Sequence, residues 1–410
     1  MDIAIIGGGA AGFFSAITCA IAMPQSQVTI FERGKSVLEK VRISGGGRCN
    51  VTHACFDAKT LVQYYPRGSR ELLGPFMQFG PQQTIEWFQK RGVALKTEAD
   101  GRMFPTTDNS QTIVDCLQKA AQQAGVTVRT HTRVEKIFLA ADKKNFQLQV
   151  QGEAKLLSFS KVLIATGSNT AIWEMLQSLG HTIVPPVPSL FTFNIKDPRI
   201  LDLMGIAAAH AQVRVPGTKL QSEGPLLITH WGMSGPGILR LSAWGARALE
   251  AHAYQFPLEV NWLGRLDAEA ISDQLQQQKM EHAKKLIFAR PLFELPARLW
   301  ERLVTAAEIP DTLRWADLDK KRMQKLITQL SAGNFSVKGK STFKEEFVTA
   351  GGVALNEVNF KTFESKKVPG LYLAGEVLDI DAITGGFNFQ AAWTGAWIAG
   401  NAMAQALMQE

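Results

Sequence analysis

The chain opens with the stretch Met1-Asp2-Ile3-Ala4-Ile5-Ile6-Gly7-Gly8-Gly9-Ala10-Ala11-Gly12, which decides the fold. Residues 3–6 are apolar and mostly β-branched, as expected of a strand buried in a parallel sheet. Gly7, Gly9 and Gly12 follow with G-x-G-x-x-G spacing, which suits a tight turn, a close approach of the backbone to a pyrophosphate and close packing of the next helix. The helix predicted from Ala10 onward points its free N–H groups and positive dipole end at the phosphates.

A second strand and an acid complete this unit. Residues 28–31 read Val-Thr-Ile-Phe, and Glu32 follows Gly12 by 20 residues. At this spacing a carboxylate accepts hydrogen bonds from a ribose. Strand, turn, helix, strand and acid in register predict a dinucleotide-binding βαβ unit, which fits NAD or FAD.

Residues 3–23 contain no charged side chain and are long enough to cross a membrane. Three consecutive glycines near their start, with no basic segment before them, argue against a membrane span or a signal peptide. We expect a buried strand and a buried helix instead, in a cytoplasmic protein with no membrane partner.

A second glycine-rich segment lies near the other end of the chain. Residues 371–376 read Leu-Tyr-Leu-Ala-Gly-Glu, and Gly385-Gly386-Phe387-Asn388 precedes a helix predicted at about 388–407. A second strand ending in Gly375-Glu376, with a glycine turn before the last helix, suits a two-ended cofactor and favours FAD. The positive end of that helix would stabilise an anionic reduced flavin. A second G-x-G-x-x-G is absent, so we expect no separate pyridine-nucleotide domain.

The order of the patterns predicts an α/β fold: a discontinuous Rossmann-like FAD-binding domain of residues 1–185 and 345–410. Residues 185–188 read Pro-Pro-Val-Pro and predict a stiff hinge. Alternating stretches beyond it predict an inserted antiparallel β module over 186–265. A charged helical pattern predicts a small helical module over 266–344.

The composition is that of a globular protein, with 46% hydrophobic and 20% charged residues. The four cysteines (Cys19, Cys49, Cys55 and Cys116) form no C-x-x-C pair, and the histidines form no cluster. We therefore expect reduced thiols and no bound metal.

The net charge is +7, and a basic stretch without any acid contributes strongly to it. Its charged residues are Lys320, Lys321, Arg322, Lys325, Lys338, Lys340 and Lys344. A solvated face is the favoured interpretation, and a patch that attracts RNA is the alternative.

Three motifs together resemble one known family. They are Ser44-Gly45-Gly46-Gly47-Arg48-Cys49-Asn50-Val51-Thr52, residues 229–236 (Thr-His-Trp-Gly-Met-Ser-Gly-Pro), and residues 375–390 with Gly-Glu-Val-Leu-Asp and Gly-Gly-Phe-Asn-Phe-Gln. The chain resembles the BaiN-type (HI0933-like) family of bacterial NAD(P)/FAD-dependent oxidoreductases over nearly its whole length. The resemblance implies bound FAD, a Rossmann-like domain, and an inserted β-barrel with a helical module.

The resemblance also implies roles for individual residues. The loop of residues 44–50 lies along the flavin, Glu32 holds the adenosine ribose, and Val134 meets the adenine through its backbone. Together with the glycine turns, the expected cofactor-binding residues are Gly7, Gly9, Ala11, Gly12, Glu32, Arg33, Arg42, Ser44, Gly45, Gly46, Gly47, Arg48, Cys49, Asn50, Val134, Ala165, Thr166, Gly167, Gly375, Glu376, Asp379, Gly385, Gly386, Phe387, Asn388 and Phe389.

The sequence departs from the family pattern at three places. The loop after Gly167 is short, Ala382 stands where a glycine is common, and Phe387 stands where a tyrosine is common. The short loop bears on substrate geometry more than on FAD binding.

Three residues are candidates for chemistry. His230 is a candidate proton donor, because a histidine titrates near working pH, or else a hinge residue. Cys49 is a candidate reactive thiol, although filling space in a tight loop is the favoured interpretation. Arg48, like Arg42, is a candidate for contact with an anionic substrate or the pyrophosphate, and an ordinary surface arginine is the alternative. Ser234, before Gly-Pro, is expected to be a helix N-cap.

The expected function is that of an FAD-dependent oxidoreductase, which passes hydride between flavin N5 and an unsaturated or amine substrate. NAD(P)H is the candidate electron donor. The family's known activities are reduction of carbon–carbon double bonds in steroid intermediates, oxidation of small amines and reduction of uracil in ribosomal RNA. The alternatives are therefore an RNA uridine reductase that uses the basic stretch, and a sensor that holds FAD without turnover. The oligomeric state is not predicted.

Overall fold

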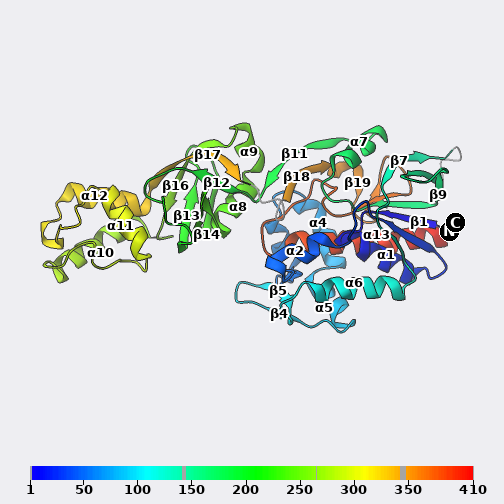
Figure 1. The fold of residues 1–410 in the computed structure, drawn as a ribbon, viewed down its shortest axis with the longest axis horizontal. Coiled ribbons are helices and arrows are strands. Elements are labelled where there is room, and N and C mark those ends of the chain that lie inside the picture. Colours follow the sequence, from blue (N-terminus) through cyan, green and yellow to red (C-terminus); the bar gives the residue numbers. More distant parts are fainter. Residues whose placement is uncertain (1, 141–144, 265, 342–347, 410) are drawn as a thin grey trace. The chain divides into compact units, whose positions relative to one another are not determined.

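The chain forms two compact units in a computed structural model that describes residues 2–140, 145–264, 266–341 and 348–409. The first unit contains Met1–Pro186 and Val348–Glu410, and the second contains Val187–Phe347 (Figure 1). Met1 of the opening stretch and Lys344 of the basic stretch lie outside the described residues. Residues 345–347, predicted to begin the second part of the FAD-binding domain, also lie outside them.

The first unit is built on a seven-stranded sheet with the order β19-β20-β21-β10-β1-β2-β6. The five strands from β21 to β6 are parallel, and β20 and β19 add an antiparallel edge. With β1 between β2 and β10, this is the doubly wound order in which ligands bind at the carboxyl edge beside the central strand. The strands are β1 (Asp2–Ile6), β2 (Gln27–Phe31), β6 (Thr127–Arg129), β10 (Lys161–Ile164), β19 (Val358–Asn359), β20 (Glu364–Ser365) and β21 (Leu371–Leu373).

Two helices from opposite ends of the chain pack together beside this sheet. They are α1 (Ala10–Ala22) and α13 (Phe387–Met408), which lie next to each other in Figure 1. A Cβ on Gly400 of α13 would lie 2.7 Å from the carbonyl oxygen of Ser15 in α1, so glycine permits this close approach. Both chain termini therefore contribute to one core.

The remaining elements of the first unit are short. Its helices are α2 (Glu39–Gly47, with non-helical backbone at Ser44, Gly45 and Gly46), α3 (Ala58–Leu61), α4 (Ser69–Gln78), α5 (Pro81–Gln89), α6 (Gln111–Gln123) and α7 (Thr170–Ser178). Two further sheets contain β3 (Thr52–His53), β5 (Arg102–Pro105) and β4 (Leu95–Thr97), and β7 (Val134–Leu139), β8 (Phe146–Val150) and β9 (Leu157–Phe159).

The uncharged residues 3–23 form β1 and α1 and lie mostly buried in this unit. Among the described residues, no helix has the length and apolar character needed to cross a membrane.

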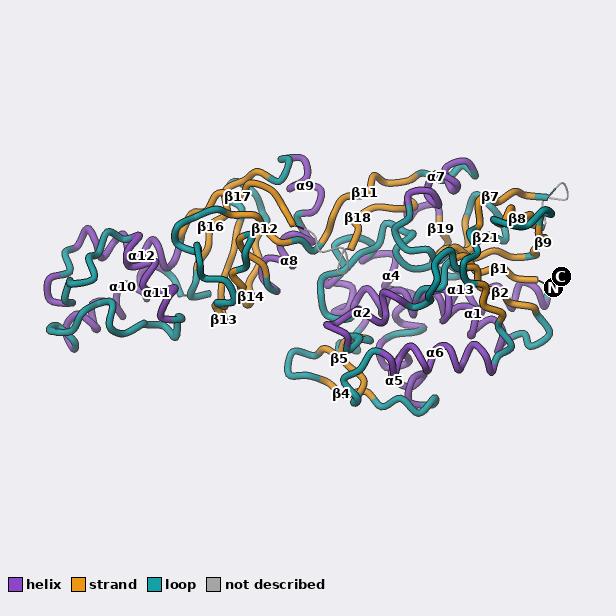
Figure 2. Tube along the Cα trace, in the orientation of Figure 1, coloured by secondary structure: helices purple, strands orange, loops and turns teal. Residues whose placement is uncertain are grey.

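The second unit contains a closed barrel with the strand order β12-β15-β14-β13-β16-β17. Helices α10, α11 and α12 lie beyond one end of it (Figure 2). The elements are β12 (Thr192–Ile195), β13 (Ala207–Arg214), β14 (Gln221–Ile228), β15 (Gly232–Ser234), α8 (Pro236–Trp244), α9 (Ala246–Ala251), β16 (Gln255–Asn261), α10 (Ala268–Glu281), α11 (Ala297–Ala306), α12 (Lys320–Ser331) and β17 (Gly333–Ser341).

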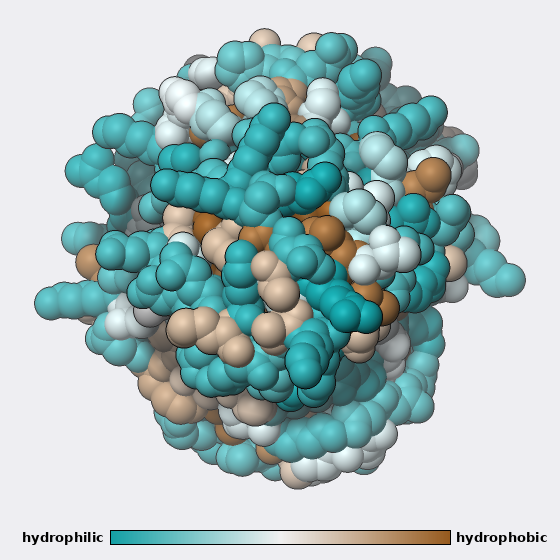
Figure 3. All heavy atoms as spheres, turned by 90° about the vertical axis from the view of Figure 1, so that its left-hand side faces the viewer, coloured by the Kyte–Doolittle hydropathy of each residue, from teal (hydrophilic) through white to brown (hydrophobic). Residues whose placement is uncertain are grey.

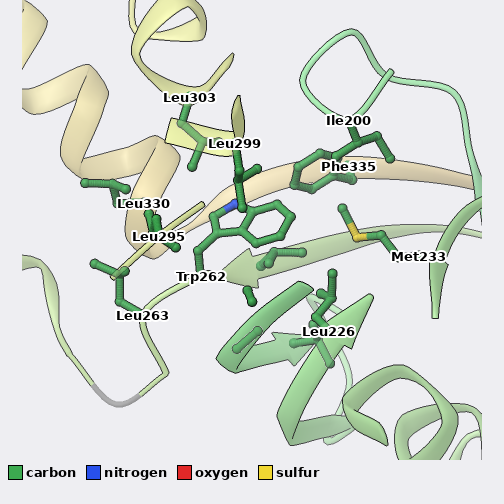
Figure 4. Packing of buried hydrophobic residues seen from close by; sticks show 14 of the residues in the cluster. Ile200, Leu226, Met233, Trp262, Leu263, Leu295, Leu299, Leu303, Leu330 and Phe335 are labelled. Atoms are coloured by element: carbon green, nitrogen blue, oxygen red, sulfur yellow. The ribbon is translucent and has the colours of Figure 1, made fainter. Parts of the chain in front are cut away.

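The predicted division at residue 265 is wrong for the last barrel strand. Residues 333–341, assigned to the helical module, form β17, which pairs with both β12 and β16 and so closes the barrel. One hydrophobic core serves barrel and helices together: Trp262 packs among Leu299, Leu303, Leu330 and Phe335 (Figure 4). A shared core joins the two predicted modules into one unit.

The predicted proline hinge falls at the boundary of the two units, between Pro186 and Val187. The prolines of residues 185–188 lie inside β11 (Ile183–Ser189), which forms a two-stranded sheet with β18 (Val348–Val353). Prolines are tolerated there because an edge strand does not need every N–H for pairing. The predicted fold class itself is confirmed: a Rossmann-type α/β domain with a closed barrel and helical segments.

Candidate functional site

A cavity of about 660 Å³ lies in the first unit, where the parallel strands end. The first glycine turn, the end of β2, the end of β10 and the segment after β21 all contribute to its wall. Both terminal segments of the chain thus meet at one site of a size typical of ligand pockets. Predicted residues on the wall are Gly7, Gly9, Ala11, Glu32, Arg33, Val134, Ala165, Thr166, Gly167, Gly375, Glu376, Asn388 and Phe389.

Each glycine of the first turn suits its position for a different steric reason. Gly7 has a φ of 111°, and a Cβ on it would lie 2.4 Å from the carbonyl oxygen of Ala165. A Cβ on Gly12 would lie 1.9 Å from the carbonyl oxygen of Gly7, which explains why Gly12 is needed although it is not on the wall. A Cβ on Gly9 would meet no atom within 4 Å, so this glycine leaves open space at the cavity.

The start of α1 is suited to an anion. Its N-cap residue is Gly9, which provides no side-chain cap, and its first turn holds no acid. Backbone N–H groups at such a terminus attract a phosphate.

Glu32 is held in place by the backbone around it. Its carboxylate accepts hydrogen bonds from Gly8 N at 2.9 Å and from Gly34 N at 2.7 Å. Arg33 and Val134 line the same cavity. This arrangement leaves a fixed carboxylate at the end of β2, where a ribose is expected.

The C-terminal segment approaches the first helix directly. A Cβ on Gly375 would lie 3.3 Å from the Ala11 Cβ, so this glycine allows the two segments to meet. The Asn388 side chain accepts from Ala382 N at 2.9 Å and donates to Ala382 O at 3.2 Å, and it thereby closes the turn before α13. Gln390 points elsewhere: it is buried and hydrogen-bonded to Thr52, Thr84 and Thr394.

The loop of residues 44–50 does not line the cavity, but it touches the turn before α13. The Asn50 amide, oriented to suit its neighbours, accepts from Gly386 N at 3.0 Å and donates to Thr52 O at 3.0 Å. Gly45, Gly46 and Gly47 are exposed and have positive φ angles of 58°, 67° and 81°. Ser44 donates its hydroxyl to Val41 O. The structure thus brings this loop to Gly386 and leaves its glycines accessible.

Arg42 and Arg48 both have protein partners. Arg42 donates to Gln111 and lies 3.7 Å from Glu39. Arg48 pairs with Glu98 at 2.6 Å and lies over the Phe104 ring. These contacts fasten the loop of residues 44–50 to its surroundings, so they favour a structural role for Arg48.

Cys49 has a fully buried side chain, and burial raises the pKa of its thiol to about 12. A neutral thiol is a poor nucleophile. The surroundings therefore favour the space-filling interpretation of Cys49 over the catalytic one.

Phe387 begins α13 within a cluster of aromatic rings. Its ring stacks on Tyr64 at 4.4 Å and on His53 at 4.6 Å, and Tyr65 donates its hydroxyl to Phe387 O at 2.5 Å. Burial lowers the pKa of His53. Gly385 and Gly386 precede the cluster with φ angles of 134° and 88°. His53 and Tyr64 were not predicted, because no local sequence pattern indicates that their rings stack on Phe387.

Two aspartates near this turn are buried, the predicted Asp379 and its neighbour Asp381. Asp381 forms an ion pair with Arg67, and Asp379 donates its backbone N–H to Val353 O. Neither lines the cavity. Burial and pairing point to a structural role for Asp381.

His230 lies in the second unit, on the tight turn between β14 and β15, and is exposed. Thr229 N donates to Gly232 O at 2.8 Å across this turn. The prediction for Ser234 is wrong: Gly235 is the N-cap of α8, and the Ser234 hydroxyl instead lies 2.9 Å from the Thr192 hydroxyl. Ser234 ends strand β15, and its side chain therefore faces a neighbouring strand.

The basic stretch is divided between two elements of the second unit. Lys320 and Lys321 are exposed on α12, whereas Arg322 pairs with Asp319 and Lys325 pairs with Glu308. Lys338 and Lys340 lie on β17. From the side of α10, α11 and α12 the surface is mostly hydrophilic, with some hydrophobic side chains showing in its middle (Figure 3). Within the described ranges, no group of three or more potential metal ligands comes together.

Comparison with known proteins places these features in one family. The family described as "HI0933-like protein Rossmann domain" matches residues 1–402. The "Ribosomal RNA dihydrouridine synthase" of Escherichia coli (strain K12) is 31% identical over 97% of this chain and 96% of the relative. The "3-dehydro-bile acid delta(4,6)-reductase" of Clostridium scindens is 29% identical over 98% of this chain and 99% of the relative.

A solved structure shares the fold. The 3-ketosteroid-delta4-(5alpha)-dehydrogenase from Rhodococcus jostii RHA1 superposes with a TM-score of 0.52 at 15% identity, covering 98% of this chain and 96% of the other. With the family match over nearly the whole length and the cavity built from both termini, the chain belongs to the HI0933-like (BaiN-type) family of flavoprotein oxidoreductases.

Proposed function

We propose that this protein is an FAD-dependent reductase that saturates a carbon–carbon double bond of an unsaturated substrate. One observation carries the cofactor part: a single cavity is walled by the Gly7–Gly9 turn, by Glu32 and by the segment of Gly375 and Asn388. A ligand that uses all three needs an anionic middle and two distinct ends, as FAD has.

The residues present fit FAD in three respects. The open space at Gly9 and the uncapped start of α1 suit the pyrophosphate, and the carboxylate of Glu32 suits the ribose. The first residues of α13 suit the flavin end, because the positive end of a helix stabilises negative charge. When bound, FAD supplies hydride transfer at its N5 atom. The chain's own groups bind, orient and shield the reactants.

The substrate class rests on the relatives. The names of the Escherichia coli and Clostridium scindens proteins both describe the reduction of an unsaturated substrate, a uridine in one and a bile acid in the other. We therefore propose an unsaturated substrate ahead of an amine. NAD(P)H is the proposed electron donor, and His230 remains the proposed proton donor.

The decisive experiment uses the purified protein with its flavin reduced anaerobically. Candidate oxidants are added singly: a conjugated enone, a uridine-containing RNA and, for comparison, an imine as the oxidised form of an amine. Reoxidation by the enone or the RNA, with the saturated product identified by mass, supports the proposal. Reoxidation by the imine alone contradicts it. Protein that takes up no FAD on reconstitution contradicts the cofactor as well.

The electron donor is tested by stopped-flow mixing of the oxidised protein with NADH or NADPH. Rapid bleaching of the flavin supports an enzyme that uses this donor. A flavin that neither nucleotide reduces, and that no substrate of the panel reoxidises after chemical reduction, favours the sensor alternative.

A second candidate function is reduction of a uracil within RNA. The 31% identity to the Escherichia coli relative and the exposed Lys320 and Lys321 favour it. If these lysines contact phosphates, the variant K320Q/K321Q lowers the salt dependence of RNA binding by about two units of log–log slope. The matched control is K90Q/K119Q in the first unit. Equal slopes for both variants contradict this use of the basic stretch.

A further inference from the structure

An ion pair joins two cavity-lining residues from opposite ends of the chain. Lys40, in the first turn of α2, lies with its Nζ atom 2.6 Å from Oε2 of Glu376, 336 residues later. Both side chains line the cavity. The Lys40 side chain is 57% exposed and that of Glu376 only 20%. The pair therefore lies at the rim of the cavity, with the carboxylate on the inner side.

The strand order shows that this pair joins two segments that lie on either side of the turn after β10. Glu376 follows β21, and the loop before Lys40 is tied to the first glycine turn by a hydrogen bond from Leu38 N to Gly8 O at 2.8 Å. Between β21 and β1 lies β10, whose following turn ends at Gly167. A Cβ on Gly167 would lie 3.5 Å from Glu376 Oε2 and 4.0 Å from Lys40 Nζ. The pair thus reaches over the turn after β10.

The fold does not need this pair for its stability. An ion pair with one strongly exposed member contributes little to folding, because water competes for both charges. The position of the pair at the cavity suggests a role in ligand binding instead. A dinucleotide brings negative phosphates to the start of α1, and the Glu376 carboxylate would repel them if it were not neutralised.

We propose that Lys40 is a cofactor-retaining residue: its pair with Glu376 closes over the bound dinucleotide, neutralises the carboxylate and slows release of the cofactor. This inference rests on the proposed function, because it takes FAD as the ligand. Lys40 acts on the cofactor partly through Glu376 and is a positioning residue. Glu376 is a predicted cofactor-binding residue, whereas no local sequence pattern singles out Lys40.

The test measures the rate of FAD release after dilution of the holoprotein, from the rise of flavin fluorescence. We expect K40M to release FAD about two- to fivefold faster than the wild type, because it removes a partly exposed ion pair and leaves the Glu376 carboxylate unneutralised. The swapped variant K40E/E376K releases FAD more slowly than K40M, because the pair is restored with its charges exchanged. If the two side chains acted independently, the swap would give no such rescue.

Salt supplies a second readout. Release from the wild type accelerates with ionic strength, and release from K40M changes less, because salt screens only a pair that exists. The charge-matched control is K119M, which removes an exposed lysine of α6 away from the cavity and leaves the release rate unchanged.

Two results separate the possible failures. If the wild type holds FAD and K40M releases it at the wild-type rate, or if the swapped variant releases it no more slowly than K40M, the inference is overturned and the proposed function stands. If the wild type binds no FAD, the proposed function fails, and the inference fails with it.

Discussion

The carboxylate of Asp381 is fully buried and forms a two-pronged ion pair with the guanidinium group of Arg67, 314 residues earlier in the chain. Arg67 precedes α4, and Asp381 precedes the glycine turn of α13. The pair therefore connects the segment before α13, which leads to the cavity wall, with the N-terminal part of the first unit.

Replacing Asp381 by Asn is expected to lower the free energy of unfolding by about 3–5 kcal/mol, because it breaks an ion pair whose carboxylate is fully buried and whose guanidinium group is only 11% exposed. Urea denaturation of the holoprotein measures this difference. The matched control is E259Q, which breaks the pair with Arg214, whose side chain is 58% exposed, and should cost about 0–1 kcal/mol. Equal losses in the free energy of unfolding for the two variants would show that burial does not strengthen the Asp381 pair.

Alanine at Gly9 and alanine at Gly12 are expected to fail in different ways. A Cβ at position 9 enters open space at the cavity, so G9A should fold with a normal far-UV spectrum and hold less FAD. A Cβ at position 12 would lie 1.9 Å from the Gly7 carbonyl oxygen, so G12A should lose stability as well. Thermal unfolding and flavin content, measured on both, distinguish these outcomes. A G9A protein with full flavin content would show that the cofactor does not approach this turn.

Acid is expected to weaken the first unit through Glu357. Burial alone would raise the pKa of this carboxyl, but hydrogen bonds from Lys367, Thr182 and His181 lower it from 4.5 to about 2. A lowered folded-state pKa stabilises the folded protein above pH 4.5, and this contribution is lost as the pH falls toward 2. Burial also lowers the pKa of His181 despite its contact with Glu357, so protonation of this histidine disfavours the fold below about pH 6.5.

The measurement is the urea midpoint of the wild type and of E357Q between pH 7 and pH 3. The wild type should lose stability on acidification more steeply than E357Q, which lacks the titrating carboxyl. Parallel curves for the two proteins would contradict the assignment to Glu357.

The four cysteines should react with iodoacetamide in an order set by their burial. Burial raises the pKa of Cys49 and Cys19 to about 12 and that of Cys116 to about 11, whereas Cys55 is only partly buried. We expect Cys55 to be labelled first in the native protein, as peptide mass spectrometry would show, and C55S to remove this fast phase. Fast labelling of Cys49 in the native protein would instead support its interpretation as a reactive thiol.

The main features of the cofactor site were predictable because their causes are local. The turn of Gly7, Gly9 and Gly12 needs small residues at fixed spacing, and Glu32 follows at the distance that one helix and one strand impose. The same holds for Gly375 and the start of α13. Thirteen predicted residues, from Gly7 to Phe389, accordingly line the cavity.

The partners of the loop of residues 44–50 were not predictable in the same way. Arg48 pairs with Glu98, and Cys49 is enclosed, through contacts that depend on where β4 and β5 lie. The prediction of β17 failed for a related reason: residues 333–341 follow three helices, and only pairing with β12 and β16 reveals them as a barrel strand.

The amino-acid sequence by itself determined the dinucleotide-binding turn, the second glycine segment and the family, because backbone conformation and hydrophobic period act over a few neighbouring residues. Only the tertiary structure decided which charges meet, such as Lys40 with Glu376 and Arg67 with Asp381. Such pairs join positions more than 300 residues apart. Their contact depends on how strands order themselves in a sheet, which no local pattern encodes.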